Sequence, residues 1–226
     1  MWLVEIDRGS AADFHQRDLP ADLQPSLWWF EVERPALVLG SGQPIEHIDV
    51  RACEQAGIEI VRRRSGGGAV LLEPDDVLWV DVLIPFGHPM WTPDVTSSAW
   101  WLGEMWHLAL GSLGMVGTEV HRGPLRHTTW SRHVCFAGTG GGELTLGERK
   151  VVGISQRRTR AGVRLQCALY RHWRPENHVA LFSAPGPTVD DLCGIAAAVA
   201  LPVSEIRRAV ADALNNLSSS SPARRQ

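Results

Sequence analysis

Three glycines follow three arginines in the segment Arg62 to Gly68, which reads RRRSGGG. Consecutive glycines let a backbone approach a bound molecule closely and adopt torsion angles that other residues avoid. Arginine side chains beside such a loop can bind carboxylate or phosphate oxygens through two parallel hydrogen bonds. The segment lacks both the Gly-Lys-Ser/Thr of a Walker loop and the spacing of a dinucleotide-binding fingerprint. It indicates either an anion-binding loop or a flexible turn flanked by surface charge.

Lysine and arginine together number 22, yet Lys150 is the single lysine of the chain. A lone lysine is expected where arginine cannot substitute, because lysine carries a compact ammonium on a flexible stem. Lys150 stands three residues before Gly153, and Ser155 and Gln156 follow in the same segment. A lysine fixed on a strand can stabilise a phosphate or a developing oxyanion. The simpler alternative is an exposed cation on a strand.

Cys135 is a candidate nucleophile, because Arg132, His133 and the later Lys150 could favour its thiolate form. The alternative is a small buried apolar residue, which is typical of a cysteine between valine and phenylalanine. The 4 cysteines lack CxxC spacing, and the 9 histidines lack the HxxxH or HxH spacing of metal ligands. We therefore expect neither a disulfide framework nor a metal site.

The composition indicates an ordinary soluble globular protein, with 226 residues, 44% hydrophobic and 21% charged. No apolar run reaches the roughly 18 residues of a membrane-spanning helix, and the N-terminus lacks the pattern of a secretory signal. A net charge of −3 argues against a nucleic-acid coat protein. We expect a cytoplasmic protein without nucleic-acid or membrane partners.

The 10 tryptophans contrast with a single tyrosine. Most of them stand on or beside apolar segments, such as Trp28, Trp29, Trp79 and Trp106, and we expect them in the core. A wall of tryptophans could equally line a tunnel for an alkyl chain.

Apolar and turn patterns predict the elements that position these residues. Predicted strands are Pro35–Gly40, Ile58–Arg62, Ala69–Leu72, Val77–Ile84 and Leu165–Tyr170, and a hairpin joins 143–146 to 149–154. Predicted helices are Ile45–Ala56, Ser97–Leu113, Val189–Ala200 and Ser204–Leu217, the last with Ser204 as its N-cap. Strand pairs between helices predict one α+β domain over residues 1–217, built on a mixed or antiparallel sheet with flanking helices. We expect the polar tail 218–226 to be disordered.

Together these motifs resemble those of the lipoate–protein ligase and octanoyltransferase family, which is related to biotin–protein ligase. The family's Arg-Arg-x-Ser/Thr-Gly-Gly-Gly loop corresponds to Arg62–Gly68. Its block Gly-x-Lys-Ile/Val-x-Gly-x-Ala/Ser-Gln-x-Arg corresponds to Glu148–Arg158, and its early strand ending in Gly-x-x-Gln corresponds to Pro35–Gln43. The three motifs follow in the family's order and cover about residues 35 to 170.

The resemblance implies the catalytic-domain fold of biotin and lipoate protein ligases, with an acyl-binding tunnel between the glycine loop and the lysine strand. It implies an enzyme that attaches a lipoyl or octanoyl group to a lysine of lipoyl-domain proteins. Lys150 would stabilise negative charge in the transition state. The implied substrate-binding residues are Arg63, Ser65, Gly66, Gly67, Gly68, Gly153, Ser155 and Gln156.

Two chemistries remain open within this family. Ligases activate lipoate with ATP and Mg²⁺, whereas cysteine-dependent octanoyltransferases take the acyl group from acyl carrier protein onto a cysteine and need no cofactor. The transferase block reads Cys-Phe, a short loop, Glu-Leu and the lysine strand, which Cys135-Phe136, Glu143-Leu144 and Lys150 match. Ligases usually have an Asn-Asp pair in this region. The C-terminal domain of many ligases is not expected here, and a partner protein could supply it.

Four departures from the family pattern support a third hypothesis, a non-catalytic acyl- or nucleotide-binding module of the same fold. Leu72-Glu73 replaces a His-Asp pair, 75–78 replaces Gly-Asn-x-Asn, and Cys167-Ala168 replaces His-Gly. The family's N-terminal helix is not recognisable in residues 8–28. The retained Lys150 and glycine run favour an enzyme.

Overall fold

A computed structural model describes residues 2–220 of the chain, without the side chains of residues 219 and 220. The strands are β1 (Leu3–Gly9), β2 (Ser26–Val32), β3 (Ala36–Leu39), β4 (Glu59–Arg62), β5 (Val70–Leu72), β6 (Val77–Pro85), β7 (Thr118–Val120), β8 (Leu144–Leu146), β9 (Arg149–Arg158) and β10 (Gly162–Tyr170). The helices are α1 (Ala11–Gln16), α2 (Val50–Gln55), α3 (Trp100–Ser112), α4 (Pro175–Val179), α5 (Val189–Cys193) and α6 (Val203–Ser220), with 3₁₀ turns η1 (Ile45–His47) and η2 (Cys135–Ala137).

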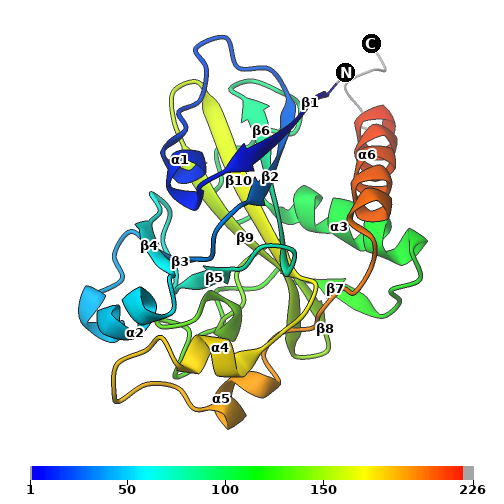
Figure 1. The fold of residues 1–226 in the computed structure, drawn as a ribbon. Coiled ribbons are helices and arrows are strands. Elements are labelled where there is room, and N and C mark those ends of the chain that lie inside the picture. The colour runs from blue at the N-terminus through cyan, green and yellow to red at the C-terminus, as the bar shows by residue number, and fades with distance from the viewer. Residues whose placement is uncertain (1, 221–226) are drawn as a thin grey trace.

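The strands form two sheets (Figure 1). The larger sheet has seven strands in the order β1-β2-β6-β10-β9-β8-β7, and the smaller has three in the order β4-β3-β5. The pairs β1–β2 and β3–β4 are parallel, whereas the other strand pairs are antiparallel. The predicted α+β class with a mixed sheet and flanking helices is confirmed.

Each face of the larger sheet has its own apolar core, because successive strand residues point to opposite faces. On one face, Val80 and Val82 of β6 pack with residues of α3 and α6, such as Met105. On the other face, Trp79 and Leu83 pack with residues of the small sheet and α1. The predicted strands β3, β5, β6 and β10, the hairpin β8–β9 and the central helix α3 are all present. The candidate site lies on the face turned towards the small sheet.

The helix predicted over Ile45–Ala56 is wrong in its first half. That half forms the 3₁₀ turn η1, and α2 starts only after Asp49, whose side chain accepts a hydrogen bond from the Ala52 amide at 3.0 Å. A side-chain acceptor at this position satisfies one of the free amides of the first turn, so the helix begins there.

The helix predicted over Val189–Ala200 is also too long. Helix α5 ends at Cys193, and the residues after Gly194 pair with the lysine strand instead. The Lys150 amide donates to the Ile195 carbonyl at 2.8 Å, and the Ala197 amide donates to the Lys150 carbonyl at 2.8 Å. The C-terminal part of the chain therefore braces the backbone of Lys150.

Two further expectations about the chain ends are corrected. Helix α6 starts at Val203, so Ser204 lies in its first turn and is not the N-cap, and the helix continues to Ser220, into the expected disordered tail. The rest of that tail, 221–226, lies outside the described residues. The family's N-terminal helix motif is not recognisable in the sequence, and the structure has a short helix in this region: α1 begins after Ser10, whose hydroxyl accepts a hydrogen bond from the Asp13 amide at 3.1 Å.

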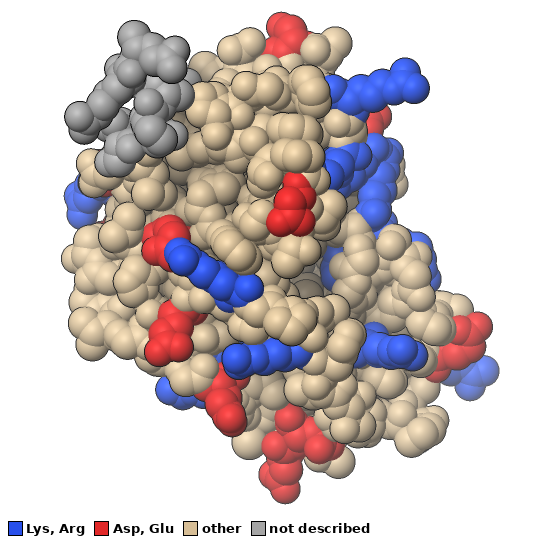
Figure 2. Space-filling model, turned by 180° about the vertical axis from the view of Figure 1, so that it is seen from behind, with Lys and Arg blue, Asp and Glu red and all other residues tan. Residues whose placement is uncertain are grey.

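The surface carries charges of both signs. Figure 2 shows one face on which basic and acidic side chains alternate with large uncharged areas, and no uniformly basic surface covers this face. Among the described residues, no helix combines the length and the apolar character needed to cross a membrane.

Candidate active site

Two cavities meet beside Cys135. We call the first the slot: it encloses about 450 Å³ of empty space, its open mouth included, and lies between the two sheets. Much of its wall is apolar, with contributions from Val38, Val70, Leu72, Trp79 and Phe136. We call the second the cleft, an open hollow bordered by the glycine loop and Lys150. Cys135, Ile154 and Ser155 line both cavities, so the thiol-bearing residue stands where the slot opens into the cleft.

Arg63 lies buried beneath the glycine loop, with 4% of its surface exposed. Its Nη2 donates to the carbonyls of Gly66 and Gly68 at 2.8 and 2.9 Å, and its Nη1 donates to the Val38 carbonyl at 3.2 Å. Only Nε has no hydrogen-bond partner among the described residues. The structure therefore uses most of the guanidinium to hold the loop, whereas the prediction assigned it to substrate binding.

The glycine loop and the cysteine segment are in direct backbone contact. The Ala69 amide donates to the His133 carbonyl at 2.7 Å, and the Cys135 amide donates to the Ala69 carbonyl at 2.9 Å. A Cβ on Gly68 would lie 2.9 Å from the Cys135 nitrogen, closer than real contacts allow. Within the described residues, the amides of Gly66, Gly67 and Gly68 donate to no protein group. The loop thus offers unpaired N–H groups at the edge of the cleft.

Lys150 is buried and paired, with 2% of its side chain exposed, so the alternative of an exposed strand cation is wrong. Its Nζ lies 2.7 Å from Glu143 Oε2 and donates to the carbonyl of Cys135 at 2.8 Å. Glu143 also accepts hydrogen bonds from the amides of Gly140 and Ile154, at 2.6 and 2.9 Å. The ammonium is thus fixed to the cysteine segment by one contact and to the β8–β9 hairpin by the other.

Glu143 is a site residue that we did not predict. The signal was present, because Glu143-Leu144 occupies a fixed place in the family's transferase block. Its burial next to the only lysine could not be seen in the sequence, because β8 and β9 pair with a shift in register between Leu144 and Thr145.

The two polar residues that follow Gly153 point to opposite faces of the sheet. Ser155 faces the slot, where its Oγ accepts a hydrogen bond from the Ser65 hydroxyl at 3.0 Å. Gln156 faces away: its Oε1 accepts from Ser98 and its Nε2 donates to the Val95 carbonyl. Gly153 and Ser155 line the slot, Ser65 lines neither cavity and reaches the site through its hydrogen bond to Ser155, and Gln156 lies outside.

The predicted neighbours of Cys135 are only partly in place. Arg132 lines the cleft. The ring of His133 instead stacks on His47, with 4.1 Å between ring centroids, and burial together with the nearby His47 lowers the pKa of His133. A neutral imidazole supplies no positive charge, so His133 does not favour the thiolate as expected. Lys150 contacts the carbonyl of Cys135.

Cys167 is among the residues that line the slot, but it does not line the cleft. It stands on β10, where neighbouring residues alternate between faces, and it belongs to the apolar core that contains Trp106. Burial raises the pKa of its thiol far above the ordinary range. Cys135 is therefore the one cysteine among the described residues that lines both cavities.

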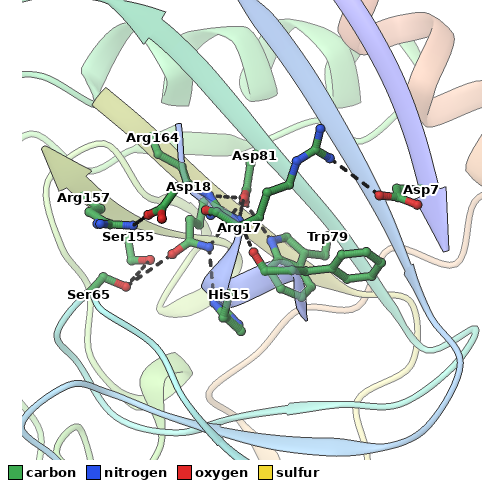
Figure 3. Close-up of polar contacts among 12 residues, drawn as sticks. Asp7, His15, Arg17, Asp18, Ser65, Trp79, Asp81, Ser155, Arg157 and Arg164 are labelled. Atoms are coloured by element: carbon green, nitrogen blue, oxygen red, sulfur yellow. Dashed lines mark hydrogen bonds and ion pairs between the residues drawn. The ribbon is translucent and has the colours of Figure 1, made fainter. Parts of the chain in front are cut away.

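His15 of α1 lines the slot, although no motif indicated it. Its ring stacks on Trp79, with 4.4 Å between centroids; Figure 3 labels both residues. Its Nδ1 lies 3.4 Å from Nε2 of Gln166. Burial, reinforced by the charges of Arg164 and Arg63, lowers the pKa of His15 to about 3. The buried residues of α1 are Ala11, Phe14 and His15. Their spacing is that of one helix face, and this pattern could have placed the histidine on the inner side of the helix.

The cleft provides poor ligands for a divalent cation. Among the described residues that line it, Glu143 is the only carboxylate, and it is already shared by Lys150 and two backbone amides. Protein-bound Mg²⁺ usually takes one or two carboxylates besides substrate phosphates. No group of three or more potential ligand side chains within the described residues is arranged to hold a metal. The donor set does not fit Mg²⁺, whereas the unpaired loop amides would suit an anion.

The two-sheet α+β fold, with a glycine loop and a buried lysine beside a largely apolar slot, is the arrangement that the sequence resemblance implies for a biotin/lipoate protein ligase catalytic domain. Residues 12–215 match the family described as "Lipoyl protein ligase A/B catalytic domain", and the chain belongs to this family. The predicted resemblance is thus confirmed over most of the chain.

Individual relatives agree with this assignment. The octanoyltransferase LipM of Carboxydothermus hydrogenoformans is 35% identical over 133 residues, which cover 58% of this chain and 48% of that protein. LipM of Moorella thermoacetica is 33% identical over 146 residues, which cover 63% of this chain and 51% of that protein. The chain thus matches about half the length of these curated relatives.

A solved structure shows the same fold. A bi-partite lipoate protein ligase from Thermoplasma acidophilum superposes with a TM-score of 0.71 at 17% identity, covering 96% of this chain and 83% of that chain.

Proposed function

We propose that this chain is a cysteine-dependent octanoyltransferase, which moves an octanoyl group from acyl carrier protein through Cys135 to a lysine of a lipoyl-domain protein. The observation that carries the proposal is the place of Cys135, which lines both the apolar slot and the open cleft. The slot suits the alkyl chain, and the cleft gives the two protein substrates access to the same sulfur. The names of the LipM relatives support the same activity.

The reaction has two steps. The Cys135 thiolate attacks the carbonyl carbon of the thioester, and the carrier's thiolate leaves, so that the acyl group is bound to Cys135. The neutral amine of the acceptor lysine then attacks this new thioester. Its nitrogen loses a proton as the amide forms, and the Cys135 thiolate is released.

Both steps pass through a tetrahedral oxyanion beside the sulfur. The unpaired amides of the glycine loop and the fixed ammonium of Lys150 provide positive potential next to Cys135. Groups that are already oriented stabilise such a charge without reorganising during the reaction. Lys150 is held by Glu143 and the Cys135 carbonyl before substrate arrives.

An ATP-dependent ligase of lipoate or octanoate is the alternative, and the unpaired amides of Gly66, Gly67 and Gly68 at the cleft favour it. Such amides bind phosphates as well as oxyanions. In that case ATP and Mg²⁺ would be required, and an accessory protein could complete the enzyme. The acceptor would again be a lipoyl-domain protein.

Transfer assays distinguish these functions. The chain is incubated with a lipoyl domain and octanoyl-loaded acyl carrier protein without ATP, and separately with octanoate, ATP and Mg²⁺. We expect octanoylation of the lipoyl domain only in the first mixture, and we expect Cys135→Ser to abolish it. Cys193→Ser is the control, because that cysteine is exposed in α5 and lines neither cavity. Product only in the ATP mixture would establish the ligase, and no product in either would indicate a binding module.

A further inference from the structure

We propose that His15 is a specificity-determining residue that limits the length of the acyl chain in the slot. The proposal rests on the proposed function, because it concerns the acyl group that Cys135 accepts. It identifies a second part of the site, formed by α1 and β6, that none of the sequence motifs includes.

The lining residues give the slot a direction. Cys135 and Ser155 line both cavities and therefore mark the mouth, whereas His15 and Trp79 line the slot alone. An acyl chain attached at the mouth would enter the slot, whose lining includes these two rings. The imidazole stands in front of the indole, with 28° between ring planes and 4.4 Å between centroids. The pair forms a flat inner wall.

Polar contacts join this wall to neighbouring side chains. Gln166 lies between the Ser65 hydroxyl, 3.5 Å away, and Nδ1 of His15, 3.4 Å away. The Trp79 indole N–H donates to Asp81 at 2.7 Å, so the second ring of the wall is also tied to a fixed partner. Figure 3 shows His15, Trp79 and Asp81 converging on one polar cluster.

The cluster cannot give way to a longer chain. Asp81 and Arg164 are 0% and 1% exposed and form an ion pair with an N–O distance of 2.5 Å. Arg164 also donates to the carbonyls of Phe14 and Arg17, at 2.6 and 2.7 Å, which fixes the helix that carries His15. Displacing Asp81 or Arg164 would leave a buried charge without its partner, which is strongly destabilising.

The wall is uncharged where it meets the slot. The amide nitrogen of Gln166 lies 3.4 Å from Nδ1 of His15, so this side of the ring faces the polar cluster. The low pKa of His15, caused by burial and by the charges of Arg164 and Arg63, keeps the ring neutral at physiological pH. A neutral ring stacked on tryptophan suits the methyl end of a saturated chain.

The test is a chain-length profile. The enzyme is incubated with hexanoyl-, octanoyl-, decanoyl- and dodecanoyl-loaded acyl carrier protein in competition, and the acyl groups on Cys135 are quantified by intact-protein mass spectrometry. We expect the parent to favour octanoyl, and we expect His15→Ala to raise the decanoyl-to-octanoyl ratio by about tenfold. That factor corresponds to the burial of two more methylene groups in the enlarged slot.

Two variants control the interpretation. His15→Phe keeps a flat ring that is larger than the imidazole and should not raise the decanoyl-to-octanoyl ratio, which separates the space occupied by the ring from its hydrogen bonding. His178→Ala removes another buried histidine, bonded to Tyr170 and absent from the slot lining, and should keep the parental profile. An unchanged ratio in His15→Ala, or an equal shift in His15→Phe or His178→Ala, would overturn the inference. Failure of the parent to accept any acyl group would instead count against the proposed function.

Discussion

At the scale of a single residue, the surroundings of Lys150 explain why this position holds a lysine in a chain whose other Lys/Arg positions are all arginine. Its ammonium occupies a space between the Glu143 carboxylate and the Cys135 carbonyl, 2.7 and 2.8 Å away, with almost no exposure to solvent. A guanidinium is planar and larger, and it cannot direct its donors to both groups from the same position. The rarity of lysine in the sequence was thus a valid signal of a special environment.

Lys150→Arg should reduce octanoyl transfer by about 10²- to 10³-fold, the loss typical of removing one oriented donor from an oxyanion site. Initial rates with octanoyl-loaded carrier measure the effect. The matched control is Arg149→Lys, which exchanges the same two residue types at the neighbouring exposed position and should keep the parental rate. A Lys150→Arg rate close to that of the control would contradict the role of the ammonium.

Glu143→Gln should both slow transfer and destabilise the fold. The amide removes the counter-charge of Lys150, and breaking a buried ion pair typically costs about 3–5 kcal/mol. Urea unfolding measures this cost. Glu104→Gln breaks the exposed pair with Arg122 and should change the free energy of unfolding by less than about 1 kcal/mol. Equal stabilities for the two variants would show that the Glu143 pair is not needed.

Many of the residues named from the sequence line the two cavities of the candidate site, but the contacts that each of them makes could not be predicted. Gln156 shows the limit: one position along β9 from Ser155, it faces the opposite side of the sheet. Arg63 binds loop carbonyls, which no motif reveals. His15 was missed because it reaches the slot through tertiary packing with Trp79, far away in the sequence.

At the scale of elements, the strands and helices with regular apolar patterns were predicted well, whereas the ends of individual helices were predicted poorly. The hairpin β8–β9 and the helix α3 follow from local sequence, namely a glycine turn and a helical apolar face. The length of α5 does not, because residues 195–197 satisfy their backbone groups by pairing with the Lys150 strand. A local propensity is overridden where a neighbouring strand offers hydrogen bonds.

The junction between the glycine loop and the cysteine segment gives an element-scale prediction. Gly68→Ala should lower both transfer and the melting temperature, because its Cβ would meet the backbone of Val134 and Cys135 at 2.8 and 2.9 Å. Gly66→Ala should melt like the parent, since nothing lies within 4 Å of the corresponding Cβ. Differential scanning calorimetry compares the two. If both variants melt alike, the close approach does not constrain the loop.

At the scale of the whole molecule, buried neutral histidines link stability to pH. Burial is the main cause that lowers the pKa of His15 to about 3 and that of His178 to about 4, whereas an unfolded chain has histidine pKa values near 6.5. Below about pH 6.5 the unfolded state binds protons that the folded state does not, so stability is lost as the pH falls.

We expect the free energy of unfolding to be lower at pH 5 than at pH 7, by about 2 kcal/mol for each of the two histidines. Urea titrations at the two pH values measure it. His15→Phe should lose about half of this dependence, because it removes one of the two groups. Equal stability of the parent at both pH values would contradict the burial of neutral histidines.

The central claim is that Cys135 carries the acyl group, and intact-protein mass spectrometry tests it most directly. The chain is mixed with octanoyl-loaded acyl carrier protein in the absence of ATP and of any acceptor. We predict a mass gain of one octanoyl group that neutral hydroxylamine removes, that Cys193→Ser retains and that Cys135→Ser lacks. An adduct that persists in Cys135→Ser, or no adduct on a parent that still octanoylates a lipoyl domain, would contradict the account.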